Sequence, residues 1–199
     1  IVLHHVKQST AMNKRNIIRL ILISVLMACT GHNAFERSLS VADSLMHEQP
    51  DSAYRLLCAM EQDAARMPEA LQMRRLLLLS NAQNKAYKSF ASDSIGTLLT
   101  EYYDRNGNAN ERMLAHYIKG CTYRDLGDQP AALNCFNQAI DAADTSLADC
   151  DFRQLCIVHA QIAGIFRKRG LPDEALLAYE KAEQYALKNK DTLSLLNIA

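Results

Sequence analysis

The sequence contains no tryptophan, only 7 glycines and 4 prolines among 199 residues, and no net excess of either charge. So little glycine and proline excludes collagen-like and low-complexity chains, and 49% hydrophobic residues are enough to fill a core. Because 22 Lys plus Arg balance 22 Asp plus Glu, the basic excess typical of nucleic-acid-binding proteins is missing. The composition therefore indicates one or two globular domains without a nucleic-acid partner.

The sequence also lacks the motifs that carry catalysis or bind metals. It contains no G-x-S-x-G, H-E-x-x-H, Walker or G-x-G-x-x-G pattern and no C-x-x-C pair. We therefore predict no enzyme activity, no metal site and no cofactor. Five cysteines are expected to be mainly buried thiols that pack as small hydrophobic groups, with one disulfide left open as an alternative. They are Cys58, Cys121, Cys135, Cys150 and Cys156.

One polar stretch, residues 104–111, is similar to a calcium-binding loop because Asp and Asn alternate along it. The similarity fails because Ala109 stands where the loop needs glycine and Glu111 comes four residues too early. A polar turn between two helices is the simpler interpretation, and we predict that structure here.

The N-terminal segment has the pattern of an export signal. Lys14 and Arg15 precede an apolar run from Ile17 to Ala28 that is interrupted by Arg19. A helix needs roughly 20 apolar residues to cross the hydrocarbon core, so this run is too short for a permanent membrane span. We expect residues 1–28 to comprise upstream residues and a signal peptide that starts at Met12.

The end of that run, Leu26-Met27-Ala28-Cys29, resembles the lipobox of bacterial lipoproteins. The resemblance implies cleavage before Cys29 and attachment of a diacylglycerol to its thiol, which would anchor the protein to a membrane. Thr30 is not an acidic retention residue, which favours the outer membrane, facing the periplasm. An ordinary secretory signal and a short buried helix are the alternatives. Residues 29–33 would be a short linker.

From residue 34 onwards the sequence repeats a helical pattern. Small and apolar residues recur at steps of four, three and four, which places them on one face of a helix. The copies begin 42, 37 and 43 residues apart. Their first residues are Ala53, Ile95, Ala132 and Ala175. Each period has room for two helices, so the pattern predicts successive helix pairs.

In the last two copies a glycine stands five residues before the first position. These residues, Gly127 and Gly170, are predicted to end the preceding helix in the left-handed conformation, which favours a residue without a Cβ. The corresponding residues of the first two copies are Glu48 and Phe90. Small Gly120 and Ala163 are expected to let the neighbouring helix approach, with Tyr123 and Phe166 filling the space beside it.

The stretches from Gly120 to Ala139 and from Ala163 to Ala182 resemble tetratricopeptide repeats. The resemblance implies an all-α fold, an α-solenoid of about four antiparallel helix pairs over residues 34–199, with a longer period than the family's usual 34 residues or so. The domain would end inside a further helix. Together with the signal segment, the chain looks like the repeat-containing lipoproteins of Bacteroidetes.

Such a solenoid implies a non-enzymatic scaffold that binds a protein or peptide in its concave face. Helical phase places five residues in or beside this groove, with an ordinary solvated surface as the alternative. They are Tyr117, Arg124, Asp125, Arg167 and Lys168. The three basic residues among them favour an acidic or C-terminal peptide. Two other functions stay open: the exported sensor domain of a longer signalling protein, and a glycan-uptake lipoprotein, which the absence of tryptophan disfavours.

Overall fold

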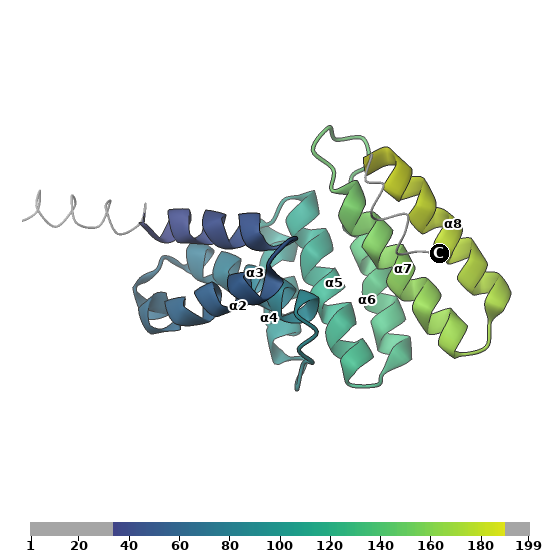
Figure 1. Ribbon diagram of the computed structural model, residues 1–199, viewed down its shortest axis with the longest axis horizontal. Helices are drawn as coiled ribbons and strands as arrows, with labels where there is room; N and C mark the ends of the chain where they lie inside the picture. The colour runs from purple at the N-terminus through teal and green to yellow at the C-terminus, as the bar shows by residue number, and fades with distance from the viewer. Residues whose placement is uncertain (1–33, 190–199) are drawn as a thin grey trace, which may run out of the picture.

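The computed structural model describes residues 34–189, and all regular secondary structure in this range is helical (Figure 1). Residues 34–45 form the first helical stretch. The elements that follow are α2 (Pro50–Ala59), the 3₁₀ helix η1 (Met60–Arg66), α3 (Glu69–Lys85), α4 (Ser94–Asn106), α5 (Ala109–Asp125), α6 (Gln129–Ala142), α7 (Phe152–Lys168) and α8 (Pro172–Asn189). The predicted all-α class is confirmed. The signal segment 1–28, the linker 29–33 with Cys29, and the end of the predicted repeat domain lie outside the described residues.

The helices follow one another in chain order from one end of the molecule to the other (Figure 1). Residues 126–128 alone join α5 to α6, and residues 169–171 join α7 to α8, so each closely packed pair is antiparallel. The second helix of one pair contacts the first helix of the next, α4 on α5 and α6 on α7. Each helix therefore packs mainly against its neighbours in sequence.

Helix α3 joins two hydrophobic cores. Leu71 and Leu78 face the N-terminal core, whereas Met73 and Leu77 face the larger core formed by α4 to α8. The buried N-terminal core comprises Leu39, Ala42, Met46, Ala53, Leu57, Met60, Met67, Leu71, Leu78 and Ala82. Because apolar residues lie on more than one side of α3, both cores depend on this helix.

The predicted buried stripes are confirmed in α2, α6 and α8. Ala132, Phe136 and Ala139 are completely buried in α6. Ala175 and Ala182 are buried at the corresponding places of α8, where alanine lets α7 approach closely. The spacing of four and three residues therefore identifies the face that packs on the preceding helix.

The stripe predicted for the second copy, Ile95, Leu99, Tyr102 and Asn106, is wrong by one residue except at Leu99, and Asn106 at its end is exposed. Ile95 is 39% exposed, whereas Gly96 is buried against α5. A Cβ at Gly96 would lie 3.1 Å from the Lys119 Cα, so the absence of a side chain allows α4 and α5 to come this close. The buried face of α4 consequently runs through Gly96, Leu99 and Tyr103.

Gly127 and Gly170 adopt the left-handed conformation that the sequence predicts, with φ of 84° and 73°. The Asp128 N–H donates to the Tyr123 carbonyl over 2.9 Å, which caps the end of α5. The turn at Gly170 repeats this bond over 3.0 Å, from the next residue to the Phe166 carbonyl. The two turns therefore share one hydrogen-bonding geometry.

A third copy of this turn follows α3, but its left-handed residue is Tyr87, with φ of 56°. The Lys88 N–H donates to the Gln83 carbonyl over 3.0 Å, the bond that caps the other two turns. Phe90, which takes this place in the sequence pattern, is instead buried in the core, and Glu48 does not have a positive φ. The connection from α3 to α4 is longer than the turns at Gly127 and Gly170. For that reason the sequence pattern placed Phe90, and not Tyr87, at the left-handed position.

The polar stretch at 104–111 is a helix-capping turn. The Asn108 side chain accepts a hydrogen bond from the Glu111 N–H over 3.0 Å, and the Glu111 carboxylate accepts one from the Asn108 N–H over 2.9 Å. This reciprocal pair caps the start of α5. Asn110 fastens the turn to the connection before α7 by donating to the Asp149 carbonyl over 2.8 Å.

Four of the five cysteines in the described range are buried, and Cys58 is exposed. None of the five forms a disulfide there. No helix within residues 34–189 combines the length and the apolar character that crossing a membrane requires.

Gly120 provides a test of the helix packing. A Cβ at this position would lie 2.5 Å from two atoms of the buried Phe136 ring, whereas a Cβ at Gly164 would meet nothing within 4 Å. Overpacking costs about 1–3 kcal/mol, which exceeds the gain in helix propensity of about 1 kcal/mol. We expect Gly120→Ala to lower the free energy of unfolding in urea and Gly164→Ala to raise it slightly. Equal effects of the two substitutions would contradict this packing.

Candidate functional site

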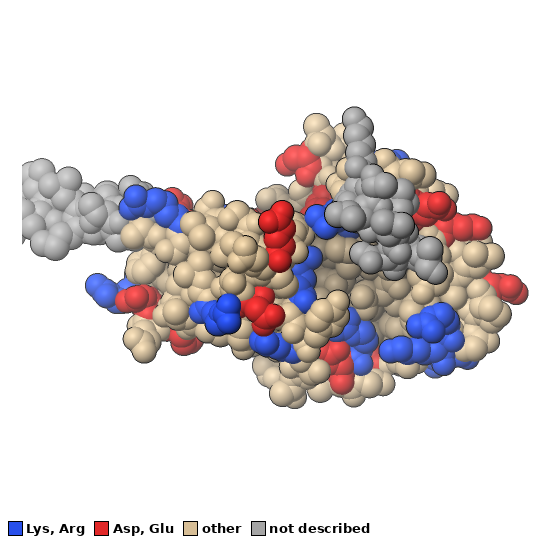
Figure 2. Space-filling view, in the orientation of Figure 1, with Lys and Arg blue, Asp and Glu red and all other residues tan. Residues whose placement is uncertain are grey.

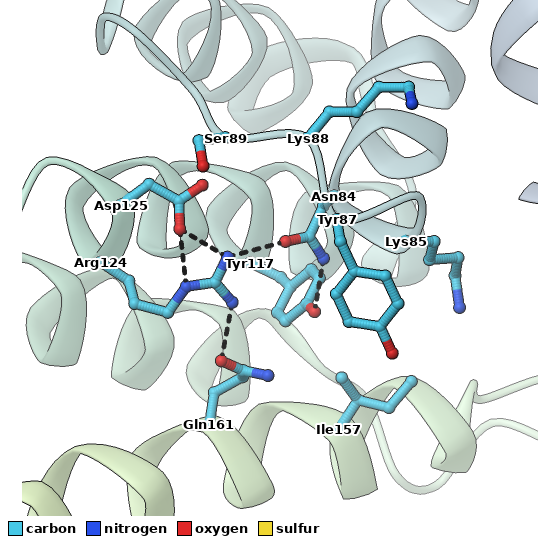
Figure 3. A pocket seen from close by; sticks show the side chains of 10 residues that line it. All are labelled: Asn84, Lys85, Tyr87, Lys88, Ser89, Tyr117, Arg124, Asp125, Ile157 and Gln161. Carbon is cyan, nitrogen blue, oxygen red and sulfur yellow. Dashed lines mark hydrogen bonds and ion pairs between the residues drawn. The ribbon is translucent and has the colours of Figure 1, made fainter. Parts of the chain in front are cut away.

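Two adjoining clefts, with volumes of about 420 and 670 Å³, open on one side of the molecule. The smaller cleft is drawn in Figure 3. The clefts share four lining residues from α3, the turn after it, and α7. These are Lys85, Tyr87, Ile157 and Gln161. The shared residues make the two clefts one continuous depression.

The depression is lined by the first helix of successive pairs and by the turns that follow these helices. Helices α3, α5 and α7 contribute side chains, and α4, α6 and α8 contribute none. Met46 and His47 after the first helical stretch, and Pro50 at the start of α2, complete the larger cleft. The first helices therefore form one face of the molecule, and the clefts lie along it.

Arg124 ties the floor of the smaller cleft together (Figure 3). Its Nε and Nη2 donate to Asp125 Oδ1 over 2.9 and 2.7 Å. Its Nη1 donates to Gln161 Oε1 over 2.8 Å and contacts the Cys121 sulfur at 3.7 Å. Its Nη2 also donates to Asn84 Oδ1 over 3.0 Å. A guanidinium has five N–H donors, and these five contacts use all of them.

Asp125 extends this network to the turn after α3, where its Oδ2 accepts a hydrogen bond from the Phe90 N–H over 3.2 Å. Asn84 also donates to the Tyr117 hydroxyl over 3.0 Å. The network therefore links α3 and its turn, α5 and α7, the first helices of three successive pairs.

Tyr117 and Cys121 lie beneath the network and stay protonated at neutral pH. Burial raises the pKa of Tyr117 well above its usual range and raises the pKa of the Cys121 thiol to about 12. Neither group supplies an anionic nucleophile, so both act in packing and hydrogen bonding. The ring of Tyr117 packs against Phe136, with 5.9 Å between the ring centroids.

The structure brings three of the five predicted groove residues together. Tyr117, Arg124 and Asp125 line the smaller cleft. Arg167 and Lys168 are exposed near the end of α7 and line neither cleft. The occupied donors of Arg124 leave it no free N–H for a ligand carboxylate, so its role is to position the surrounding side chains.

Sequence reasoning missed the contributions of α3 and its turn. Asn84 stands three residues before the left-handed residue Tyr87, just as Arg124 stands three residues before Gly127. In both turns the N–H of the left-handed residue donates to the carbonyl of this residue, so Asn84 and Arg124 are at equivalent positions. Alignment on the turns instead of the buried stripes would have identified Asn84 and Tyr87. The missing glycine concealed this alignment.

Tyr87 is the most unusual residue of the site. Its side chain is 98% exposed although its backbone is left-handed, which costs a residue with a Cβ about 1–2 kcal/mol. Its ring points toward Ile157 on α7 and lies between the Arg124 network and Lys85 (Figure 3). A ring held this way adds almost nothing to the core, so the fold does not explain why tyrosine is present.

Basic side chains dominate the larger cleft. Of the residues that the structure describes, His47, Lys85 and Arg153 line it and no carboxylate does. Burial, followed by repulsion from Arg153, lowers the pKa of Lys85, with Asp151 acting in the opposite direction. Burial, with Lys85 and Arg153, also lowers the pKa of His47, so this ring is neutral at neutral pH. On the face drawn in Figure 2, by contrast, basic and acidic side chains are interspersed.

The two histidines at equivalent places of successive repeats have separate environments. His116 Nε2 lies 2.9 Å from Asp104 Oδ1, and the His159 ring stacks on Tyr185 with 5.4 Å between centroids. Within residues 34–189, no three side chains of His, Cys, Asp or Glu form a group that could hold a metal ion.

No family model matches the chain, and no curated protein or solved structure does so either. Function is therefore inferred from the geometry and chemistry of the two clefts.

Replacing Arg124 tests the network. Arg124→Ala would leave the largely buried Asp125 carboxylate without its charge partner and would leave two amide groups unpaired. Discounted for partial exposure, the expected loss is about 2–3 kcal/mol in the free energy of unfolding. The matched control is Arg167→Ala, at the equivalent but exposed place, with an expected change within about 0.5 kcal/mol. Urea unfolding measures both, and equal losses would refute the network's role.

Proposed function

We propose that this protein is a tetratricopeptide-like α-solenoid that binds an extended segment of a protein partner along its concave face. The observation that carries the proposal is the lining of the clefts, because α3, α5 and α7 contribute to it and the second helices of their pairs do not. Repeat proteins of this architecture use such concave surfaces for binding. The function is that of a scaffold and not of an enzyme.

The repeated turns support the solenoid. Tyr87, Gly127 and Gly170 are 40 and 43 residues apart, and each has the same capping hydrogen bonds. Helix pairs that succeed one another in chain order agree with this arrangement. Counted with the first helical stretch and α2, the described residues accommodate four such pairs.

The shape and polarity of the clefts favour a peptide segment as the ligand. The joined clefts extend from the turn at His47 to Asp125, past three helix pairs, which suits an extended chain. Gln161 accepts from Arg124 through Oε1, so its Nε2 amide can donate to a peptide carbonyl. Ile157 provides an apolar patch beside it.

We further propose that the scaffold works at the cell envelope, anchored by lipid on Cys29 and facing the periplasm from the outer membrane. The support is the charged segment, the short apolar run and the Ala28-Cys29 end of that run. Metabolic labelling with a palmitate analogue in a bacterial host should mark the wild-type protein and leave Cys29→Ser unmarked. Equal labelling of both proteins would rule out this anchor.

Filling the clefts tests the binding function. We expect peptides selected from a random library on the wild-type protein to lose binding to Ile157→Trp, because the larger side chain fills space at a residue that lines both clefts. Leu177→Trp, on the exposed side of α8, is the matched control and should keep full binding. Ser89→Trp, an exposed lining residue, repeats the test without touching the core. Fluorescence anisotropy gives the affinities, and circular dichroism checks folding. Equal binding by all these proteins would place recognition on another surface.

A further inference from the structure

Three turns share one backbone geometry but do not share the residue at the left-handed position. Two have glycine at the left-handed position, which is the residue that this conformation favours. The third has Tyr87, whose ring is almost fully exposed and stands between the two clefts. Left-handed backbone at a residue other than glycine is concentrated at binding sites. Glycine forms the same turn at the other two places, so the backbone conformation does not explain the tyrosine ring. The ring therefore points to a function other than forming the turn.

Lys85 lies two residues before Tyr87 and lines both clefts. Within residues 34–189, no carboxylate lies at ion-pair distance from its ammonium group. Arg153 is close enough to lower the pKa of Lys85, and among the described acids only Asp151 acts in the opposite direction. The neighbouring Lys88, by contrast, is paired with Asp51 at 3.0 Å.

We infer that Tyr87 and Lys85 form the recognition element of the depression and select a peptide segment that carries an acidic side chain next to an aromatic one. This inference rests on the peptide-binding function proposed above. The ligand's aromatic ring would pack between Tyr87 and Ile157, which point toward each other across the smaller cleft (Figure 3). Its carboxylate would pair with Lys85, beside Arg153.

The charges of the lining residues argue for an acidic ligand. Among residues 34–189, Asp125 is the one acid that lines the two clefts, and both of its oxygens are engaged, Oδ1 by Arg124 and Oδ2 by the Phe90 N–H. A basic ligand would meet Lys85 and would find no free carboxylate among the described lining residues. A ligand without charge would leave Lys85 uncompensated. Charge complementarity therefore selects the acidic partner.

The test uses peptides enriched from a random 12-residue phage library on the wild-type protein and then synthesised with a fluorophore. We expect enrichment of adjacent acidic and aromatic residues. We expect Tyr87→Gly to weaken their binding about tenfold or more while the melting temperature stays equal or rises, because glycine relieves the left-handed backbone. Tyr87→Phe should keep the affinity. Tyr87→Asn, which also tolerates this conformation, should bind as weakly as the glycine variant.

Lys85→Gln should weaken binding about fivefold and reduce its dependence on salt, since one ion pair is lost. Lys168→Gln, an exposed lysine of α7 outside the clefts, is the control and should change neither quantity. The inference would be overturned if the enriched peptides had no acidic or aromatic bias, or if Tyr87→Gly bound them as tightly as the wild-type protein. If Ile157→Trp still blocked binding in that case, the proposed function would stand without this inference. Binding that survives Ile157→Trp would instead overturn the proposed function together with this inference.

Discussion

The geometry of the clefts depends on the guanidinium of Arg124. It contacts acceptors on α3, α5 and α7, and through Asp125 it also holds the turn after α3. The planar fork of arginine can make these bonds in several directions at once, which the point charge of lysine cannot. Because every N–H is used, the side chain is fixed and its charge is neutralised. The lining of the clefts is therefore built around a largely buried polar network whose hydrogen bonds are already made.

The residue three positions before each left-handed turn residue has a different role in each helix pair, because the helices around it differ. Asn84, Arg124 and Arg167 each stand three residues before a left-handed turn residue. Asn84 and Arg124 bond to each other, since α3 and α5 lie side by side. Arg124 also reaches α7, whereas no first helix follows α8 in the described part of the chain, and Arg167 is exposed. The presence of a first helix on each side thus determines whether the arginine at this position joins a hydrogen-bond network, as Arg124 does, or is exposed, as Arg167 is.

The sequence alone predicts the C-terminal helix pairs well, because Gly127 and Gly170 mark the turns and the alanine stripes mark the packed faces. The prediction is less accurate at the second pair, where the turn residue is tyrosine and the close contact is made by Gly96 instead of a large side chain. Three residues of the smaller cleft, Tyr117, Arg124 and Asp125, were found from the phase of α5. The remainder depends on contacts between residues about 40 positions apart, which a single sequence does not display.

Tyr87 shows how a turn between helices can present an exposed side chain at small cost in stability. The turn needs only a backbone conformation, and its hydrogen bonds are the same with tyrosine as with glycine. The strain of about 1–2 kcal/mol is small beside the 5–15 kcal/mol that stabilises a typical domain. The exposed ring makes few contacts with the core, so a change of side chain here leaves the helix packing intact. Because the ring lines both clefts and adds little to the core, the fold leaves the side chain at this position open to the recognition role proposed above.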